Sequence, residues 1–82
     1  MSDTEILARI AWDIGNAEEA MGPDGLVVLM SAALLGRLFS KLTIVGHPPH
    51  TELFGCRVKF VPSSGLWWMV GIERNVTEEG NG

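Results

Sequence analysis

The sequence predicts an α+β domain with the element order helix, strand, helix, strand, strand. Three observations predict this class: an apolar stripe at helical spacing near the N-terminus, an apolar strand that runs directly into a helix over residues 25–42, and an alternating segment followed by an aromatic one over residues 53–73. We expect a small three-stranded, mostly antiparallel sheet with both helices on one face, because this arrangement buries every apolar stripe.

Residues 2–21 are expected to form the first helix. Ser2 is followed three residues later by Glu5, which is the pattern of a capping box. Apolar residues then recur on one stripe of the helix: Ile6, Leu7, Ile10, Ile14, Ala17 and Met21. Trp12 points away from this stripe, so it indicates a contact site; the alternative is that a loop or the C-terminal hairpin folds over it.

Residues 25–42 are expected to supply most of the core. The apolar run 26–30 is typical of a strand that is covered on both faces. Ser31 is a good helix N-cap residue, and helix-forming residues continue from there to Leu42. Residues 43–45 are β-branched and can add a brief strand, whereas the prolines within 46–50 predict a rigid loop.

Two further strands are expected after Leu53, joined as a hairpin by the turn over residues 62–65. In the first, Cys56, Val58 and Phe60 alternate with Arg57 and Lys59, which is typical of a half-buried strand. The second covers residues 66–73 and contains Trp67 and Trp68. Because neighbouring strand residues point to opposite faces, one tryptophan is expected in the core and the other on the face of Arg57 and Lys59.

Length and charge narrow the classes of function. The chain has 82 residues and a net charge of −4, so we expect one domain, over residues 1–74, and no nucleic-acid partner, because phosphate binding favours basic surfaces. The single cysteine and the absence of a signal-like N-terminus predict a cytoplasmic protein, and no segment is apolar enough for a membrane span. Residues 75–82 lack periodicity and are expected to be disordered.

A protein-binding surface is the best candidate site. Small domains often complete their burial by oligomerisation, and 46% of this chain is hydrophobic. The predicted partner-binding residues are Trp12, Arg57, Lys59 and Trp67, which combine aromatic and cationic side chains. The alternative for Arg57 and Lys59 is that they merely cover an aromatic ring as a solvated layer.

His47, His50, Glu52 and Cys56 are residue types that bind zinc, but their spacing matches no known metal site. We therefore predict a solvated loop, and for Cys56 a buried structural thiol rather than a nucleophile activated by His50. The sequence carries no phosphate-binding glycine motif and no recognisable catalytic constellation. No catalytic residue, metal ligand or cofactor is predicted, and the protein is expected not to be an enzyme.

Leu53, Gly55, Val58 and Pro62 form a pattern of strand, proline-containing turn and final strand. This pattern resembles the C-terminal segment of tailed-bacteriophage major capsid proteins, and the strand and helix over residues 27–42 are similar to those that precede it there. Cys56 stands where a small aliphatic residue is usual, and the chain is too short to be a capsid subunit. The resemblance implies a small phage protein, such as a virion accessory protein or a host-directed factor.

These observations together predict a small, self-associating protein-interaction protein, located in the host cytoplasm or the virion if it is phage-encoded. One alternative is an inhibitor that binds a bacterial protein through an acidic surface, which would use Glu18, Glu19, Asp24, Glu78 and Glu79. A second alternative is a metal or thiol site around His47, His50 and Cys56.

Overall fold

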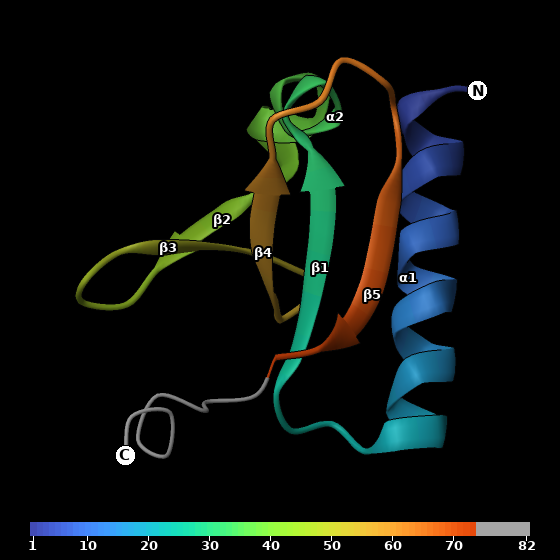
Figure 1. Cartoon of the computed structure of the whole chain (residues 1–82), viewed down its shortest axis with the longest axis vertical. Helices are drawn as coiled ribbons and strands as arrows, with labels where there is room; N and C mark the ends of the chain where they lie inside the picture. The colour runs from blue at the N-terminus through green and yellow to red at the C-terminus, as the bar shows by residue number, and fades with distance from the viewer. Residues whose placement is uncertain (74–82) are drawn as a thin grey trace.

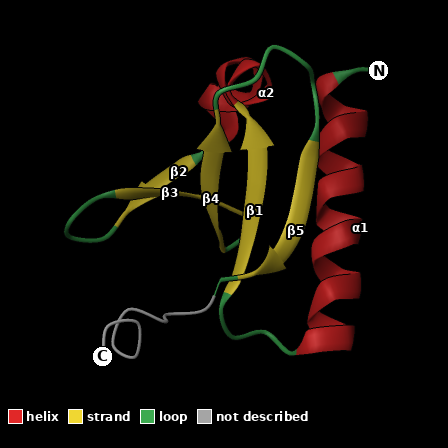
Figure 2. Cartoon of the chain, in the orientation of Figure 1, coloured by secondary structure: helices red, strands yellow, loops and turns green. Residues whose placement is uncertain are grey.

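A computed structural model of the chain describes residues 1–73. It confirms the α+β class but shows five strands in one mixed sheet rather than three mostly antiparallel ones. The predicted disordered tail over residues 75–82 lies outside the described residues. Figure 1 shows the elements along the chain, and Figure 2 shows the same view coloured by secondary structure.

The first helix, α1, spans Asp3–Met21 and begins with the predicted capping box. Ser2 Oγ accepts a hydrogen bond from the Glu5 N–H at 3.1 Å, and Glu5 Oε1 accepts one from the Ser2 N–H at 3.1 Å. These bonds satisfy two backbone donors that a helix start otherwise leaves free. The helix ends at Gly22, whose φ of 85° suits glycine.

The central strand, β1 (Leu26–Ser31), leads directly into the helix α2 (Ala32–Leu38). Ser31 is the predicted N-cap: its Oγ accepts the Leu34 N–H at 3.2 Å. The helix is shorter than the predicted range to Leu42, because the chain tightens into the 3₁₀ helix η1 (Phe39–Lys41).

The remaining strands are β2 (Thr43–Val45), β3 (His50–Leu53), β4 (Cys56–Val61) and β5 (Trp68–Ile72). Strand β3 was not predicted, because His50, Thr51 and Glu52 give no apolar alternation. A tight turn joins β3 to β4. Phe54 and Gly55 have φ of 54° and 79° there, as two-residue hairpin turns require.

The sheet order is β2-β3-β4-β1-β5, so β1 lies between the two C-terminal strands. β1 is parallel to β4 and antiparallel to β5. The predicted hairpin between the last two strands is therefore wrong: the segment after β4 crosses the end of β1, and β5 pairs on its far side. The apolar run of β1 explains its position between β4 and β5, because a strand without polar residues is stable in the interior of a sheet.

One face of the sheet packs against α1. Buried side chains from α1, the sheet and α2 form a single core, and five of them are fully buried: Ile10, Val28, Met30, Leu34 and Leu38. The opposite face carries Leu29, with Lys59 and Met69 as its neighbours in register. We call this face, which lies opposite α1, the open face of the sheet; Met69 on it is 59% exposed.

Candidate functional site

Trp12 lies on α1, on the side away from the core, and 70% of its surface is exposed. Among residues 1–73, neither a loop nor the last strand folds over it, contrary to the alternative prediction. A tryptophan buries a large apolar area when a partner covers it, so such exposure is typical of a contact residue.

A hollow of about 450 Å³ lies beside Trp12, between α1 and β5. We call it the α1–β5 recess; its lining residues are Ala8, Arg9, Trp12, Asp13 and Trp68. Trp68 packs partly against the core, and its Nε1 donates to Asp13 Oδ2 at 2.8 Å. This bond fixes the indole of Trp68 as one wall of the recess. Trp12 and Trp68 therefore line the same hollow although they are far apart in the sequence.

The recess adjoins an open edge of the sheet, because β5 is a terminal strand in the sheet order. The Trp67 carbonyl accepts from the Ser31 N–H at 3.1 Å, and the Glu73 N–H donates to the Gly25 carbonyl at 2.8 Å. Residues 67, 69, 71 and 73 therefore direct their backbone groups toward β1. By the alternation of an antiparallel ladder, Trp68, Val70 and Ile72 direct theirs to the open edge.

Arg57 and Lys59 lie on the open face of the sheet, as predicted from their alternation in β4. Lys59 forms an ion pair with Glu73, across the strand β1 that separates β4 from β5. Met69, the neighbour of Leu29 in register, is 59% exposed on the same face. Arg57 and Lys59 thus share a surface, but Trp12 is on α1, which covers the other face.

Trp67 immediately precedes β5 and is half-buried. Its Nε1 donates to Ser63 Oγ at 3.1 Å, and its N–H donates to Ser31 Oγ at 3.4 Å. The indole is therefore held by its own loop. Alternation places Trp67 on the opposite side of the strand from Trp68, in agreement with the prediction that the two tryptophans separate.

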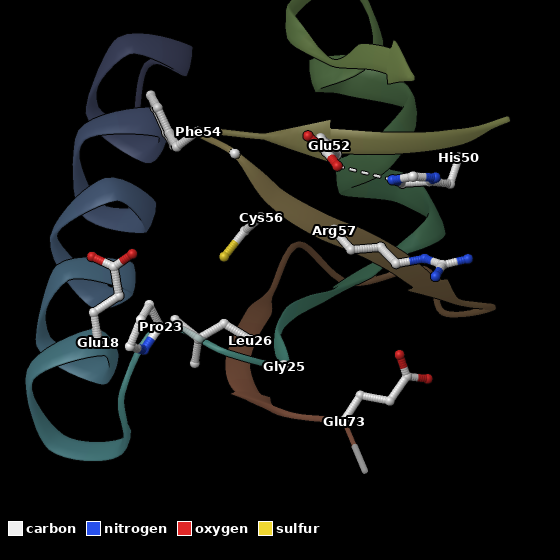
Figure 3. A pocket seen from close by; sticks show the side chains of 11 residues that line it. Glu18, Pro23, Gly25, Leu26, His50, Glu52, Phe54, Cys56, Arg57 and Glu73 are labelled. Atoms are coloured by element: carbon white, nitrogen blue, oxygen red, sulfur yellow. Dashed lines mark hydrogen bonds and ion pairs between the residues drawn. The ribbon is translucent and has the colours of Figure 1, made fainter. Parts of the chain in front are cut away.

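A second hollow, of about 370 Å³, lies where β1 begins (Figure 3). It is largely polar and contains three carboxylates and two basic side chains. The residues that line it are Glu18, Pro23, Gly25, Leu26, His50, Glu52, Phe54, Gly55, Cys56, Arg57 and Glu73.

Cys56 is buried at the inner end of this second hollow. Burial raises the pKa of its thiol, and the nearby negative charges of Glu18 and Glu52 raise it further. The thiol is therefore protonated at neutral pH and is a poor nucleophile. His50 does not serve as its base, since His50 Nε2 lies 2.9 Å from Glu52 Oε2 instead.

The metal hypothesis places His47, His50 and Cys56 together, and the structure brings only the last two to one hollow. His47 lies in the exposed loop between β2 and β3. Within residues 1–73, no three His, Cys, Asp or Glu side chains converge as a metal site would need.

Comparison of the chain with protein-family models, with curated proteins and with solved structures gives no match. In the described part of the chain, neither helix is long and apolar enough to cross a membrane.

The sequence indicated Trp12 but not the other residues of the recess. Asp13 and Trp68 are 55 positions apart, and only the placement of β5 beside α1 brings them into contact. In the sequence, only the adjacent pair Trp67 and Trp68 pointed to this recess, because neighbouring strand residues face opposite sides and one of the two had to face α1. Ile44 was also missed, although it is 63% exposed on the terminal strand β2.

Proposed function

We propose that this protein is a small, non-enzymatic interaction protein that self-associates. The observation that carries the proposal is the 70% exposure of Trp12 beside a preformed recess. Exposed apolar side chains are normal singly. Here Trp12 adjoins a second tryptophan and the terminal strand β5, whose outer edge is paired with no strand of residues 1–73. Such a combination is typical of a binding surface.

The free energy expected from burying Trp12 against a partner is large enough to change the association constant. Covering the exposed part of Trp12 would remove roughly 150 Å² of mostly apolar surface from water, which is about 3–4 kcal/mol at 25 cal/mol per Å². Ordering costs reduce this gain, yet a remainder of about 1.4 kcal/mol still changes an association constant tenfold.

A bacteriophage virion accessory role is our proposal for the biological setting. It is supported by the resemblance of Leu53, Gly55, Val58 and Pro62 to the capsid pattern. In the structure, these residues lie at the end of β3, in the tight turn, in β4 and in the segment after β4. Self-association is compatible with this setting, because virion proteins act as assemblies of many copies.

The test is the oligomeric state of the protein and of a Trp12→Ala variant, measured by native mass spectrometry and sedimentation equilibrium. We expect concentration-dependent oligomers of the natural chain and an association constant at least about tenfold lower for Trp12→Ala. The free energy of unfolding should change by less than about 0.5 kcal/mol, because Trp12 is exposed.

Phe54→Asn is the matched control. Phe54 is 54% exposed in the β3–β4 turn, outside the recess, and asparagine tolerates its positive φ. The control should associate like the natural chain. A natural chain that stays monomeric at high micromolar concentration would contradict self-association and would favour a different protein partner, such as the host protein of the inhibitor hypothesis.

A further inference from the structure

We infer that the second hollow, where β1 begins, binds a small organic cation of the alkyl diamine or polyamine class. Two carboxylates, Glu18 of α1 and Glu52 of β3, hold its ammonium groups on either side of Cys56 (Figure 3). The hollow shares no lining residue with the α1–β5 recess. The inference therefore goes beyond the proposed self-association and does not depend on it.

The second hollow has the size of a small-molecule site. Its volume of about 370 Å³ lies within the range of about 300–1,000 Å³ that is usual for such pockets. Its walls come from distant parts of the chain: the end of α1, the start of β1, the β3–β4 turn and Glu73 after β5. The pairing of β1 with β4 and with β5 holds these parts together, so the hollow is formed before a ligand binds.

Cys56 marks the inner end of the hollow. Only 6% of its surface is exposed, and Figure 3 shows its sulfur directed into the hollow, on the side of Glu18. None of the hydrogen bonds found among residues 1–73 involves this sulfur. A thiol can donate to a carboxylate and accept from an ammonium group, so a bound amine would supply the partner that this buried thiol lacks within the described residues.

The electrostatic potential at the inner end is negative. Burial raises the pKa of the Cys56 thiol, and the charges of Glu18 and Glu52 raise it further, so the fields of both carboxylates reach the sulfur. The last turn of α1 contains no basic residue, so its own side chains do not compensate the partial negative charge of the helix C-terminus. Both effects favour a cation in the hollow.

The two carboxylates lie apart, which selects the kind of cation. In Figure 3, Glu18 and Glu52 lie on opposite sides of Cys56. Within residues 1–73, no three His, Cys, Asp or Glu side chains converge, whereas Mg²⁺ and Ca²⁺ need several oxygens around one point. A diamine carries two separate charges on an apolar stem. Each charge can meet one carboxylate, and the stem can lie along Pro23 and Leu26, which also line the hollow.

The other charged groups of the lining leave the inner end to these carboxylates. Glu73 is engaged in its ion pair with Lys59. The guanidinium of Arg57 points away from the inner end in Figure 3. His50 Nε2 lies 2.9 Å from Glu52 Oε2, and this bond engages only one of the two oxygens of that carboxylate.

The test is isothermal titration calorimetry of the natural chain with putrescine and with spermidine, at constant ionic strength. We expect saturable binding of one amine molecule per chain, with a dissociation constant below about 1 mM. Butanediol, which has the length of putrescine but no charge, should bind at least about tenfold more weakly. Equal binding of the diol, or no saturable binding of either amine, would contradict a cation site.

Glu18→Gln tests the site, and Glu19→Gln is its matched control. Each variant removes one negative charge from an exposed position of α1, so both are expected to fold, which circular dichroism would verify. Only Glu18 lines the hollow. We expect Glu18→Gln to weaken putrescine binding at least about tenfold and Glu19→Gln less than about twofold. Equal losses would show attraction to the overall charge of the chain and would overturn the site.

The thiol gives a second readout of the same site. The carbon chemical shift of Cys56 Cβ, followed against pH, gives the apparent pKa of the thiol. Saturating putrescine should lower this pKa, because a nearby positive charge favours the thiolate, and Glu18→Gln should lower it by removing a negative charge. If putrescine binds without changing this pKa, it binds elsewhere and the inference fails. Trp12→Ala should bind putrescine as the natural chain does, so loss of self-association leaves this site intact.

Discussion

The β2–β3 hairpin, residues 43–53, which we call the arm, is held differently from the body of the sheet, strands β4, β1 and β5. Strands β4, β1 and β5 share a core with α1 and α2, and five side chains of that core are fully buried. In the arm, β2 has no buried side chain, and Leu53 is the single buried residue of β3. The arm therefore depends on its backbone ladder and on its attachment to β4, and a two-stranded hairpin alone is marginally stable.

This difference shows why the two regions suit different tasks. The body supplies the free energy of folding, because burial of apolar side chains is its main source. The arm leaves its apolar residues in water, where they are available to another chain. Three predictions, from the largest expected effect to the smallest, test whether the body and the arm contribute differently to the free energy of unfolding.

The largest effect is expected when a core residue of the body is truncated. Ile10→Ala removes a side chain that is fully buried and should lower the free energy of unfolding by about 2–5 kcal/mol. Ile44→Ala removes a similar side chain from the arm, where it is exposed, and should change that free energy by less than about 0.5 kcal/mol. Urea unfolding monitored by tryptophan fluorescence measures both. Equal losses would show that the arm belongs to the cooperative core.

An intermediate effect is expected at the N-cap of α2. Ser31 is fully buried, and its Oγ accepts from the N–H groups of Leu34 and Trp67, so Ser31→Ala should cost about 1–3 kcal/mol. Ser2→Ala is the matched change at the exposed start of α1 and should cost roughly 0.5–1 kcal/mol. Thermal unfolding of the two variants gives the difference. A larger loss for Ser2→Ala would contradict the role of Ser31 in joining the core to the segment before β5.

The smallest effect is expected in the arm itself. His50 and Glu52 form a half-exposed pair across 2.9 Å, and such pairs contribute at most about 1 kcal/mol. His50→Ala should therefore leave global unfolding almost unchanged but speed hydrogen exchange of the arm amides, while amides of β1 keep their protection. Faster exchange in β1 would show that the arm and the body open together.

The local elements were largely predictable because their signals are contained in short segments. The capping box at Ser2 and Glu5, the run of β1 and the cap at Ser31 all lie within a few residues of the bonds that they make. Strand β3 was not predicted, because only one of its residues is buried and its sequence therefore lacks an apolar alternation. The α2 helix ended early because its last turn became 3₁₀.

Trp12 was predicted to point away from the core because it lies off the apolar stripe of its helix, whereas its cover by a loop or by the C-terminal hairpin was left open. Its neighbours could not be predicted in the same way. Trp68 and Asp13 meet only because β5 pairs with β1 and lies against α1. Arg57 and Lys59 were placed on one face by alternation, but their distance from Trp12 depends on which face α1 covers.

The sequence alone determined the class of the fold, the helix starts, the strand β1 and the direction of Trp12 away from the apolar stripe of its helix. These features depend on apolar periodicity and helix capping, which involve residues only a few positions apart in the sequence. The tertiary structure alone decided the strand order, the insertion of β1 between β4 and β5, and the two open edges. Strand pairing joins distant segments, and alternation specifies the face of a strand but not its neighbour.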